Sequence, residues 1–438
     1  MTIDIDALVD AENGLLDAGV YTDQNIFDLE MDRVFGRCWL FLAHDSQISN
    51  ENDFLTTYMG VDPVIVVRQA DGSAKAFLNA CRHRAMRVCR EDFGNARIFQ
   101  CKYHGWCYAA DGRLVGMPFR EQYDDILDKS AWGLMQVPRI ENYRGLIFAS
   151  FDKDAPPLGE YLGDITWYLD ASLDRMPDGV EFLGGAVKWR IGANWKFGAE
   201  QFASDMYHTY TTHKSPYAVL SSDDLEHDPL ADTVDGQQYS SPWGHGFGWW
   251  LGDEERPSDA ALLPAVVREY FDDTRSSVTA RLGDERRRME SHGTVFPNLS
   301  WLYSCIPSIR VWHPKSPTEM EVSAYVFVDA QAPSEVKEAL RRFTVLTFGP
   351  SGLYEQDDGE NWVNIQNNLA SQRVRSVGLN LQASLGRNGP EKDSDGRMGP
   401  VLGEMASRGF FHRWHTLMTA TDWPPAHNLE ERKHGIAK

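Results

Sequence analysis

"NACRHRAMRVCREDFGNARIFQCKYHGW", residues 79–106, contains two short clusters that each pair one cysteine with one histidine. Cys81 and His83 form the pattern C-x-H, and Cys101 and His104 form C-x-x-H after seventeen intervening residues. Two thiolates and two imidazoles in one short stretch indicate a metal site. Zinc and iron–sulfur clusters are the candidates that such ligands suit.

The spacing within each cluster separates these two candidates. Structural zinc sites usually contain a C-x-x-C pair, which neither cluster has. In a Rieske [2Fe–2S] centre, two thiolates bind one iron and two imidazoles bind the other. One cysteine and one histidine from each of two loops supply that set of ligands. The stretch therefore predicts a Rieske centre.

The sequence around the two clusters predicts a small β domain. Asp-Gly pairs at residues 71–72 and 111–112 lie between short apolar runs, which is a strong hairpin signal. From about residue 158 longer helical patterns appear, such as residues 264–282, together with strands such as "SIRVWHP" and "EVSAYVFVD". With 438 residues, the chain is expected to form two domains, the second of α+β type.

Composition limits the partners and the compartment. The formal net charge of −21 argues against nucleic acid and anionic membranes, which both require basic surfaces. The sequence contains no apolar run long enough to cross a bilayer, and the first residues, "MTIDIDALVDAENG", are acidic. Six scattered cysteines are too few for a disulfide scaffold. We expect a cytoplasmic protein with no membrane or nucleic-acid partner.

A second candidate metal site lies in "NWKFGAEQFASDMYHTYTTHKS", residues 194–215. On a helix, Asp205 and His208 would share one face, whereas His208 and His213 would not, so the helix must end or distort between the histidines if both bind one ion. Two imidazoles and a carboxylate form the facial triad of non-haem Fe(II) oxygenases. The third ligand must come from elsewhere, and "FGPSGLYEQDDGENW" offers the candidates Glu355, Asp357, Asp358 and Glu360. A purely structural role for the two histidines remains an alternative.

With both stretches identified, the chain resembles the large (α) subunit of bacterial aromatic-ring-hydroxylating dioxygenases, the group of the biphenyl, naphthalene and 3-phenylpropionate enzymes. The likeness covers almost the whole length through motifs such as "RVFGRCWLFLAHDSQI", "FLNACRHRAMRVCR", "QCKYHGW", "NWKFGAEQFASDMYH" and "FGPSGLYEQDDGENW". The resemblance implies an all-β Rieske domain at residues 38–157. Residues 1–37 and 158–438 would form an α+β catalytic domain with a central antiparallel sheet of helix-grip type.

The resemblance also implies roles for individual residues. The Rieske cluster would be held by Cys81, His83, Cys101 and His104, and a mononuclear Fe(II) ion by His208, His213 and Asp358. Asp205 would connect the two centres by hydrogen bonding a cluster histidine of a neighbouring subunit and the iron ligand His208. Gln201 would lie near the iron, and the substrate pocket would include Phe202, Phe348 and Tyr354, the last at a position where Phe or Trp is more usual.

The function implied is that of the terminal oxygenase in a multicomponent dioxygenase. Electrons from NADH would pass through a separate reductase and a ferredoxin to the [2Fe–2S] cluster, then through His104 and Asp205 to His208 and the mononuclear iron. Both atoms of the co-substrate O2 would enter the ring of an aromatic small molecule and give a cis-dihydrodiol. Three copies of the chain would assemble with three small β subunits as α3β3.

The charges near the clusters suggest where a redox partner docks. Residues 81–113 contain seven basic and three acidic side chains, in a chain that is strongly acidic overall. The basic ones are Arg82, Arg84, Arg87, Arg90, Arg97, Lys102 and Arg113. We call these seven residues the basic rim. An acidic ferredoxin would bind there, although internal pairing of the arginines with acidic groups explains the excess equally well.

Three other functions remain open at this stage. A monooxygenase or demethylase could use the same two metal sites, a Rieske electron-transfer protein would lack catalysis, and a structural zinc protein would lack both iron centres. The substrate also remains open, because the segment 214–250 departs most from the family pattern. Residues 221–240, 386–397 and the C-terminal "NLEERKHGIAK" are the most polar stretches, and we expect them to be the least ordered.

Overall fold

The computed structural model describes residues 4–123, 126–216, 233–252, 263–304, 306–390 and 394–431. The chain divides into a small unit, Phe35–Leu158, and a large unit, Met1–Val34 with Gly159–Lys438. Cys305 and residues 217–232 of the divergent segment lie outside the described residues. Within the described ranges, none of the helices has both the length and the apolar composition that a membrane span requires.

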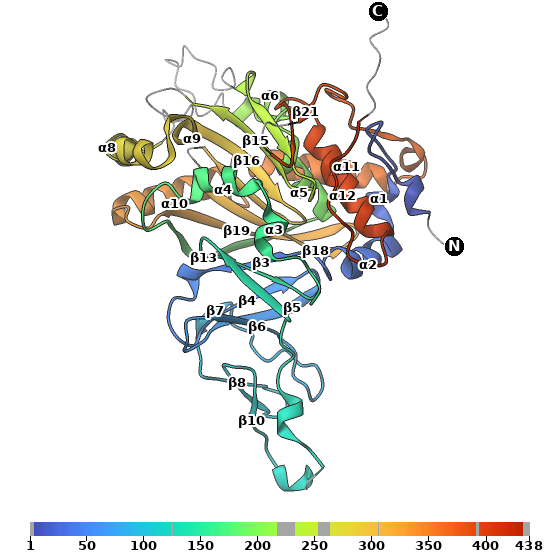
Figure 1. The fold of residues 1–438 in the computed structure, drawn as a ribbon. Coiled ribbons are helices and arrows are strands. Elements are labelled where there is room, and N and C mark those ends of the chain that lie inside the picture. Colours follow the sequence, from blue (N-terminus) through green and yellow to red (C-terminus); the bar gives the residue numbers. More distant parts are fainter. Residues whose placement is uncertain are drawn as a thin grey trace, which may run out of the picture. The chain divides into compact units, whose positions relative to one another are not determined.

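The small unit consists of short antiparallel strands in three sheets, with the orders β6-β5-β4-β7, β10-β9-β8 and β11-β12-β3 (Figure 1). Its strands are β3 (Leu40–His44), β4 (Asp53–Met59), β5 (Asp62–Arg68), β6 (Ala74–Leu78), β7 (Phe93–Asn95), β8 (Ile98–Gln100), β9 (Cys107–Ala109), β10 (Leu114–Gly116), β11 (Arg139–Tyr143) and β12 (Leu146–Ser150). Short 3-10 helices are η2 (Asp45–Gln47), η3 (Arg120–Tyr123) and η4 (Lys129–Trp132).

Both predicted hairpins are confirmed. Gly72 lies between the antiparallel strands β5 and β6, and Gly112 lies between β9 and β10. Their φ angles of 82° and 87° are in the left-handed region, where glycine avoids the steric cost of a side chain. A Cβ atom at Gly112 would also lie 2.3 Å from the ring of Phe77. The hairpins therefore position the ends of the loops that carry the cysteines and histidines.

The large unit is built on a nine-stranded sheet with the order β13-β19-β18-β17-β16-β15-β14-β22-β21, in which every pairing is antiparallel. The strands are β13 (Val180–Ile191), β14 (Gln237–Ser240), β15 (Gly246–Leu251), β16 (Met289–Val295), β17 (Leu299–Tyr303), β18 (Ser308–Ser316), β19 (Glu319–Asp329), β21 (Gly389–Pro390) and β22 (Arg397–Pro400). The predicted α+β class with a central antiparallel sheet is confirmed, as are the strands predicted at "SIRVWHP" and "EVSAYVFVD".

Helices cover this sheet and extend beyond its edges (Figure 1). They are α1 (Gly19–Thr22), α2 (Gln24–Arg33), α3 (Leu158–Leu162), α4 (Ile165–Leu173), α5 (Trp195–Ser204), α6 (Thr209–Thr212), α8 (Ala265–Leu282), α9 (Asp284–Arg288), α10 (Ser334–Phe348), α11 (Glu355–Leu369) and α12 (Met405–Thr419). A small sheet joins β1 (Val9–Asp10), β2 (Leu15–Leu16) and β20 (Leu379–Asn380), and η1 (Ile5–Ala7) and η7 (Val374–Ser376) are 3-10 helices.

The polar stretches 221–240 and 386–397 were expected to be among the least ordered, but parts of both form regular structure, while residues 221–232, 391–393 and 432–438 lie outside the described residues. Residues 237–240 form β14 inside the nine-stranded sheet, where Gln238 is fully buried and donates to the carbonyl of Gly403 at 2.8 Å. Residues 389–390 form the edge strand β21. The polar composition misled the prediction because buried amides such as that of Gln238 have all their partners within the protein.

Helix α5 is the most buried helix near the candidate iron site, since nine of its ten residues are buried. It packs on strands β15–β18 on one side and on α12 on another. Gly198 permits this close approach, because a Cβ atom there would lie 2.7 Å from the ring of Trp312 in β18. Asn194 caps the helix by accepting a hydrogen bond from the amide of Lys196 at 3.1 Å.

A buried carboxylate fixes α5 to two other helices. Glu30 of α2 is fully buried and pairs with the equally buried Lys196 of α5. Its oxygens also accept hydrogen bonds from the indole nitrogens of Trp195 at 3.0 Å and of Trp414 in α12 at 2.7 Å. A buried carboxylate with three donors is well compensated, so α2, α5 and α12 are held in one arrangement.

Candidate metal centres

The two Cys/His clusters of the small unit form two loops with the same backbone hydrogen bonds. In each loop the cysteine amide donates to the carbonyl five residues later, and the residue four positions later has a positive φ and donates back to the cysteine carbonyl. The bonds are Cys81 N to Met86 O at 2.8 Å, Cys101 N to Trp106 O at 2.8 Å, Ala85 N to Cys81 O at 2.8 Å and Gly105 N to Cys101 O at 2.9 Å. The chain therefore builds one loop twice, and each copy presents one thiol and one imidazole.

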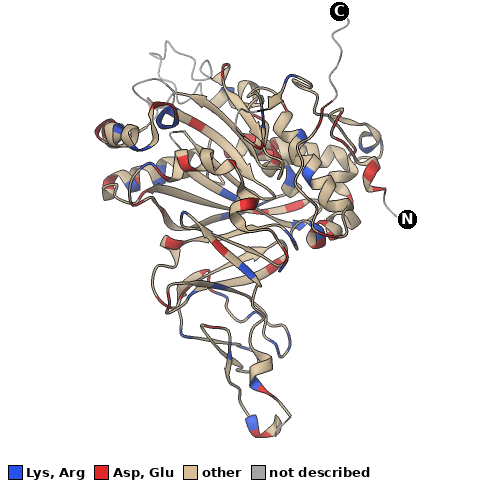
Figure 2. Cartoon of the chain, viewed as in Figure 1, with Lys and Arg blue, Asp and Glu red and all other residues tan. Residues whose placement is uncertain are grey.

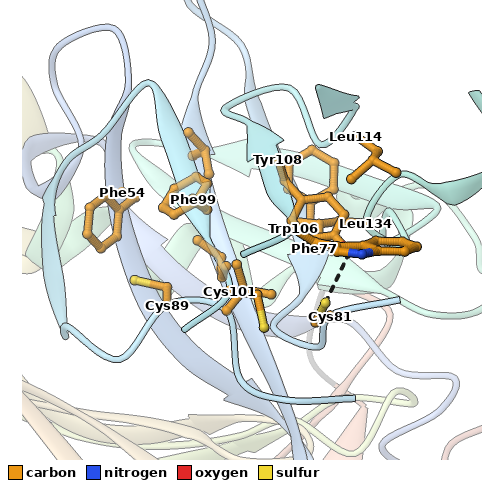
Figure 3. Close-up of a cluster of buried hydrophobic side chains, with 13 residues drawn as sticks. Phe54, Phe77, Cys81, Cys89, Phe99, Cys101, Trp106, Tyr108, Leu114 and Leu134 are labelled. Atoms are coloured by element: carbon orange, nitrogen blue, oxygen red, sulfur yellow. Dashed lines mark hydrogen bonds between the residues drawn. The ribbon is translucent and has the colours of Figure 1, made fainter. Parts of the chain in front are cut away.

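The four side chains lie together at the ends of these loops. The rings of His83 and His104 are 4.5 Å apart between centroids. Both cysteines are buried in the core of the unit among aromatic and aliphatic side chains (Figure 3). His83 is half-buried and His104 is exposed. Burial raises the pKa of the Cys81 thiol, and the neighbouring Cys101 adds to this effect. Buried sulfurs and outward imidazoles are the donor set that a [2Fe–2S] cluster needs, so these residues fit the group.

Sequence reasoning did not identify Tyr108, which contacts one of the sulfurs. The Tyr108 hydroxyl lies 3.3 Å from Sγ of Cys81 and accepts a hydrogen bond from the amide of Arg82 at 3.0 Å. Because the oxygen already accepts from the amide, its single hydrogen is available for the sulfur. Hydrogen bonds to cluster sulfurs stabilise the reduced, more negative state and raise the reduction potential.

The second site combines the end of α5, the short helix α6 and the start of α11. His208 and His213 flank the four-residue helix α6, and α5 has already ended at Ser204, so no single regular helix carries both histidines. The expectation that Asp205 and His208 share one helical face was wrong, because α5 ends at Ser204 and Asp205, with φ −81° and ψ 67°, lies outside the helical region. The resulting turn nevertheless brings Asp205 to His208, whose amide donates to Oδ1 of Asp205 at 3.2 Å.

Three of the predicted iron ligands converge on one point. Nε2 of His208 is 3.2 Å from Nε2 of His213, and these two nitrogens are 3.3 Å and 3.4 Å from Oδ1 of Asp358. All three atoms can accept a hydrogen bond or bind a cation. The other acidic candidates differ: Asp357 is 3.7 Å from Nδ1 of His213, on the far side of the ring, and Glu355 is paired elsewhere.

These three residues fit a bound metal ion. Oδ1 of Asp358 is buried and has no hydrogen-bond partner in the described part of the chain. Ligands at about 2.1 Å and right angles to one another stand about 3 Å apart, so the observed triangle corresponds to one face of an octahedral ion. A face of two imidazoles and one carboxylate leaves the opposite positions open, as in non-haem Fe(II) oxygenases.

Side chains around the three ligands orient them. The carbonyl of Asp205 accepts from Nδ1 of His208, which leaves Nε2 of this imidazole for the metal. Burial lowers the pKa of His208, but the carboxylates of Asp205 and Asp358 outweigh burial and raise it well above the usual value. Gln201 lies 3.4 Å from Nε2 of His208 and accepts a hydrogen bond from the indole of Trp362 at 2.8 Å. Gln201 is thus held beside the metal position.

A cavity of about 660 Å³ opens beside the three ligands. Its walls include every residue predicted for the iron site and the pocket, namely Gln201, Phe202, Asp205, His208, His213, Phe348, Tyr354 and Asp358. Sequence reasoning missed the remaining lining residues, Met206, Thr209, Trp250, His292, Leu302, Ser304 and Ile306. Most of these lie on or next to strands of the central sheet. The alternation of side chains along a strand shows which residues share a face, but no sequence motif marks them as pocket residues.

A larger cavity of about 1010 Å³ lies between α8, α10 and the sheet and shares Ser304 with the first. Several arginines line it, among them Arg175, whose guanidinium lies 5.0 Å from the ring of Tyr303. The positions of the metal-binding residues show which of the two cavities is the candidate active site. In the described part of the large unit, His208, His213 and Asp358 form a group that could hold an ion, and all three line the smaller cavity.

The contact between Tyr108 and Cys81 leads to a testable prediction. Tyr108→Phe should retain the cluster but lower its reduction potential by roughly 20–60 mV, the equivalent of one hydrogen bond. Tyr123→Phe removes a hydroxyl from a ring packed against the same core and serves as the control, with an unchanged potential. Redox titration followed by EPR measures both, and an unchanged potential in Tyr108→Phe would mean that the hydroxyl does not donate to the sulfur.

Comparison with known proteins agrees with both centres. Residues 38–140 match the model of the Rieske [2Fe-2S] domain, and residues 158–420 match the ring hydroxylating alpha subunit (catalytic domain). The chain is 45% identical over 435 residues to the biphenyl dioxygenase subunit alpha of Paraburkholderia xenovorans strain LB400, which covers 96% of this chain and 94% of that one. It is 44% identical over 434 residues to the benzene 1,2-dioxygenase subunit alpha of Pseudomonas putida, with coverage of 96% and 95%.

The fold leads to the same group of proteins. The structure of naphthalene 1,2-dioxygenase from Rhodococcus sp. bound to indole matches with a TM-score of 0.81 and 36% identity, over 93% of this chain and 95% of that one. The similarity extends through both units. The chain belongs to the ring-hydroxylating dioxygenase alpha subunits, the large subunits of terminal oxygenases, whose cofactors are a Rieske [2Fe–2S] cluster and a mononuclear non-haem iron.

Proposed function

We propose that this alpha subunit catalyses the cis-dihydroxylation of a neutral aromatic ring in a cytoplasmic multicomponent system. The observation that carries the proposal is the convergence of His208, His213 and Asp358 at the wall of a largely apolar cavity. When bound, the cluster supplies electrons singly and the iron activates O2 so that both atoms can enter the ring. The chain contributes the ligands, an orienting hydrogen bond at His208 and a pocket that positions the ring.

The assignment of residues to the two centres is part of the proposal. Residues 38–157 bind the cluster through Cys81, His83, Cys101 and His104. Residues 1–37 and 158–438 bind the iron through His208, His213 and Asp358, with Gln201 beside it and with Phe202, Phe348 and Tyr354 against the substrate. The distances among the side chains of each group support this assignment.

The lining of the cavity favours an uncharged substrate. No lysine or arginine is among the described residues that line it, whereas two carboxylates and several aromatic and aliphatic side chains are. Apart from the proposed iron, a substrate carboxylate would find no lysine or arginine to pair with, and a buried charge without such a partner costs several kcal/mol. One or two unsubstituted rings therefore suit the pocket better than an aromatic acid does.

Asp205 has the contacts expected of a residue that connects the two centres. Its Oδ1 accepts from the amide of His208 at 3.2 Å, and its Oδ2 lies 3.6 Å from Nδ1 of the same residue. Its side chain is one-third exposed, so a second hydrogen bond can form at the surface. We assign that second partner to a cluster histidine, His104 or His83, of a neighbouring copy in an α3β3 assembly.

The basic rim supports docking of an acidic ferredoxin that a reductase supplies with electrons from NADH. Six of its seven residues are exposed, Arg82 being the half-buried one, and Figure 2 shows Lys and Arg positions on the loops of the small unit. Among the described residues, Arg113 pairs with Asp111 at 2.7 Å, whereas Arg84, Arg90 and Arg97 are in no salt bridge. Internal pairing therefore accounts for little of the positive charge.

Product analysis with ¹⁸O2 tests the proposed reaction. The complete system with its ferredoxin and reductase should convert biphenyl or benzene to a cis-dihydrodiol that carries two ¹⁸O atoms. With 3-phenylpropionate, kcat/KM should be about 100-fold lower, because an unpaired carboxylate would have to be buried. A product with a single ¹⁸O atom would identify a monooxygenase instead, and an equal kcat/KM for the acid would contradict the inferred substrate class.

The role of Asp205 can be separated from ligand binding. Asp205→Ala should retain both iron centres yet lose at least about 100-fold in the rate of product formation, because His208 loses its connection to the electron donor. Glu360→Ala removes an exposed carboxylate on α11 and should change nothing. Iron content, the EPR spectrum of the reduced cluster and single-turnover rates provide the readouts. Wild-type turnover by Asp205→Ala would exclude the connecting role.

Ionic strength tests the docking of the ferredoxin. Reduction of the cluster by reduced ferredoxin should slow as salt rises, since the Debye length shrinks to about 3 Å at 1 M. Arg90→Glu/Arg97→Glu should slow reduction at low salt, whereas Arg342→Glu, an exposed charge reversal on α10 in the large unit, should not. Stopped-flow absorbance measures the rates. A salt-independent rate would mean that the basic rim is not the docking surface.

A further inference from the structure

A fully buried arginine lies behind the wall of the catalytic cavity. Arg310 belongs to β18, an interior strand of the central sheet, where it pairs with Ser300 of β17 and Ala324 of β19. Its side chain has no exposed surface. Hydrogen bonds on both sides fix the backbone at this position, and a buried guanidinium is costly unless partners compensate its charge. Its partners therefore indicate what Arg310 positions.

The main partner is the carboxylate of Glu355. Oε2 of Glu355 lies 3.1 Å from Nη2 and 3.2 Å from Nε of Arg310, and the Glu355 side chain is only 2% exposed. Arg310 also donates to Oγ of Ser308 at 2.9 Å and to the carbonyl of Phe348 at 3.4 Å. Three nitrogens of the planar guanidinium thus donate hydrogen bonds at the same time, an arrangement that the single ammonium group of lysine cannot reproduce.

Glu355 connects this pair to the proposed iron ligand. It is the first residue of α11, and Asp358 lies one turn later on the same helix. Tyr354 precedes the helix, but its side chain makes no capping hydrogen bond. The ion pair with Arg310 therefore anchors the first turn of α11 to the sheet and so sets the position of Asp358.

The same guanidinium contacts the aromatic wall of the cavity. Its central carbon lies 4.9 Å from the ring centroid of Phe202 and 4.9 Å from that of Phe348, distances typical of cation–π contacts. Phe348 stacks on Tyr354 at 5.1 Å, and Tyr354 meets the ring of His213 edge-on at 5.1 Å. One buried charge thus touches two residues of the substrate wall and anchors the helix of a metal ligand.

We propose that Arg310 is a positioning residue that fixes the aromatic wall of the pocket relative to the iron, and thereby determines which ring carbons face the oxidant. The inference rests on the proposed function of the same cavity. Its distinctive consequence concerns regiochemistry. Loosening the wall should change the ratio of product isomers, an effect that a loss of stability alone would not produce.

The chain contains a matched control for this idea. Arg408 of α12 pairs with Glu431 at 2.8 Å, and the exposed fractions of the two side chains, 0% and 2%, equal those of Arg310 and Glu355. Neither Arg408 nor Glu431 lines the catalytic cavity. Replacing both members of each pair avoids leaving an unpaired buried charge. The variants Arg310→Met/Glu355→Gln and Arg408→Met/Glu431→Gln therefore differ mainly in their distance from the pocket.

The experiment compares these variants with wild type in the assembled oxygenase. Iron content and melting temperature are measured first, followed by the EPR spectrum of the nitric oxide complex with and without biphenyl, and by the isomer ratio of the dihydrodiols. We expect both double variants to lose similar thermal stability. Arg310→Met/Glu355→Gln alone should shift the isomer ratio at least threefold, raise KM about tenfold and broaden the nitrosyl signal with biphenyl.

Arg310→Lys keeps the positive charge, so it can test the same role even if the double variant does not fold. It should show smaller shifts in the same direction, because the ammonium cannot contact both rings and the carboxylate at once. A wild-type isomer ratio and nitrosyl signal in Arg310→Lys and in any folded double variant would overturn the positioning role. Absence of dihydrodiol from wild type would contradict the proposed function instead, and the nitrosyl signal would still test Arg310.

Discussion

Three acceptor atoms that face one another in a buried place impose the central constraint on this structure. The imidazole nitrogens of His208 and His213 and one oxygen of Asp358 lie 3.2–3.4 Å apart, where lone pairs repel unless a cation or a proton stands between them. A packed core would not retain this arrangement for stability alone. The end of α5, the short helix α6 and the start of α11 together hold these three atoms in place.

Two buried ion pairs in the surrounding structure hold this convergence in place. The buried carboxylate of Glu30 fixes α5, and the end of α5 at Ser204 starts the turn that carries Asp205 and His208. The ion pair between Arg310 and Glu355 fixes the start of α11 and so the position of Asp358. Each anchor is a buried, compensated charge, which restricts geometry more strictly than apolar packing does.

Sequence reasoning succeeded where function depends on short-range patterns. The two Cys/His loops could be predicted because all four ligands lie within one short stretch, and the Asp-Gly hairpins mark their bases. His208 and His213 were likewise visible in one segment. The choice among Glu355, Asp357, Asp358 and Glu360 could not be made from helical geometry, because it depends on contacts with residues far away along the chain, such as Arg310, which pairs with Glu355 across forty-five positions.

The rest of the site could not be predicted for the same physical reason. Trp250, His292 and Leu302 reach the cavity only because their strands pair and twist in the nine-stranded sheet, and nothing in their local sequence marks them. Tyr108 shows the same limit in the small unit, since its hydroxyl meets Cys81 across twenty-seven residues. Long-range pairing thus decides which side chains of an ordinary strand become functional.

The most direct test of the account is EPR spectroscopy of protein purified without oxygen. The dithionite-reduced protein should give the signal of a Rieske cluster, and addition of nitric oxide should give a high-spin iron–nitrosyl signal. Asp358→Ala should abolish the second signal and leave the first intact. A protein that contains zinc and gives neither signal, or a nitrosyl signal that survives in Asp358→Ala, would contradict the claim that the chain holds two separate iron centres.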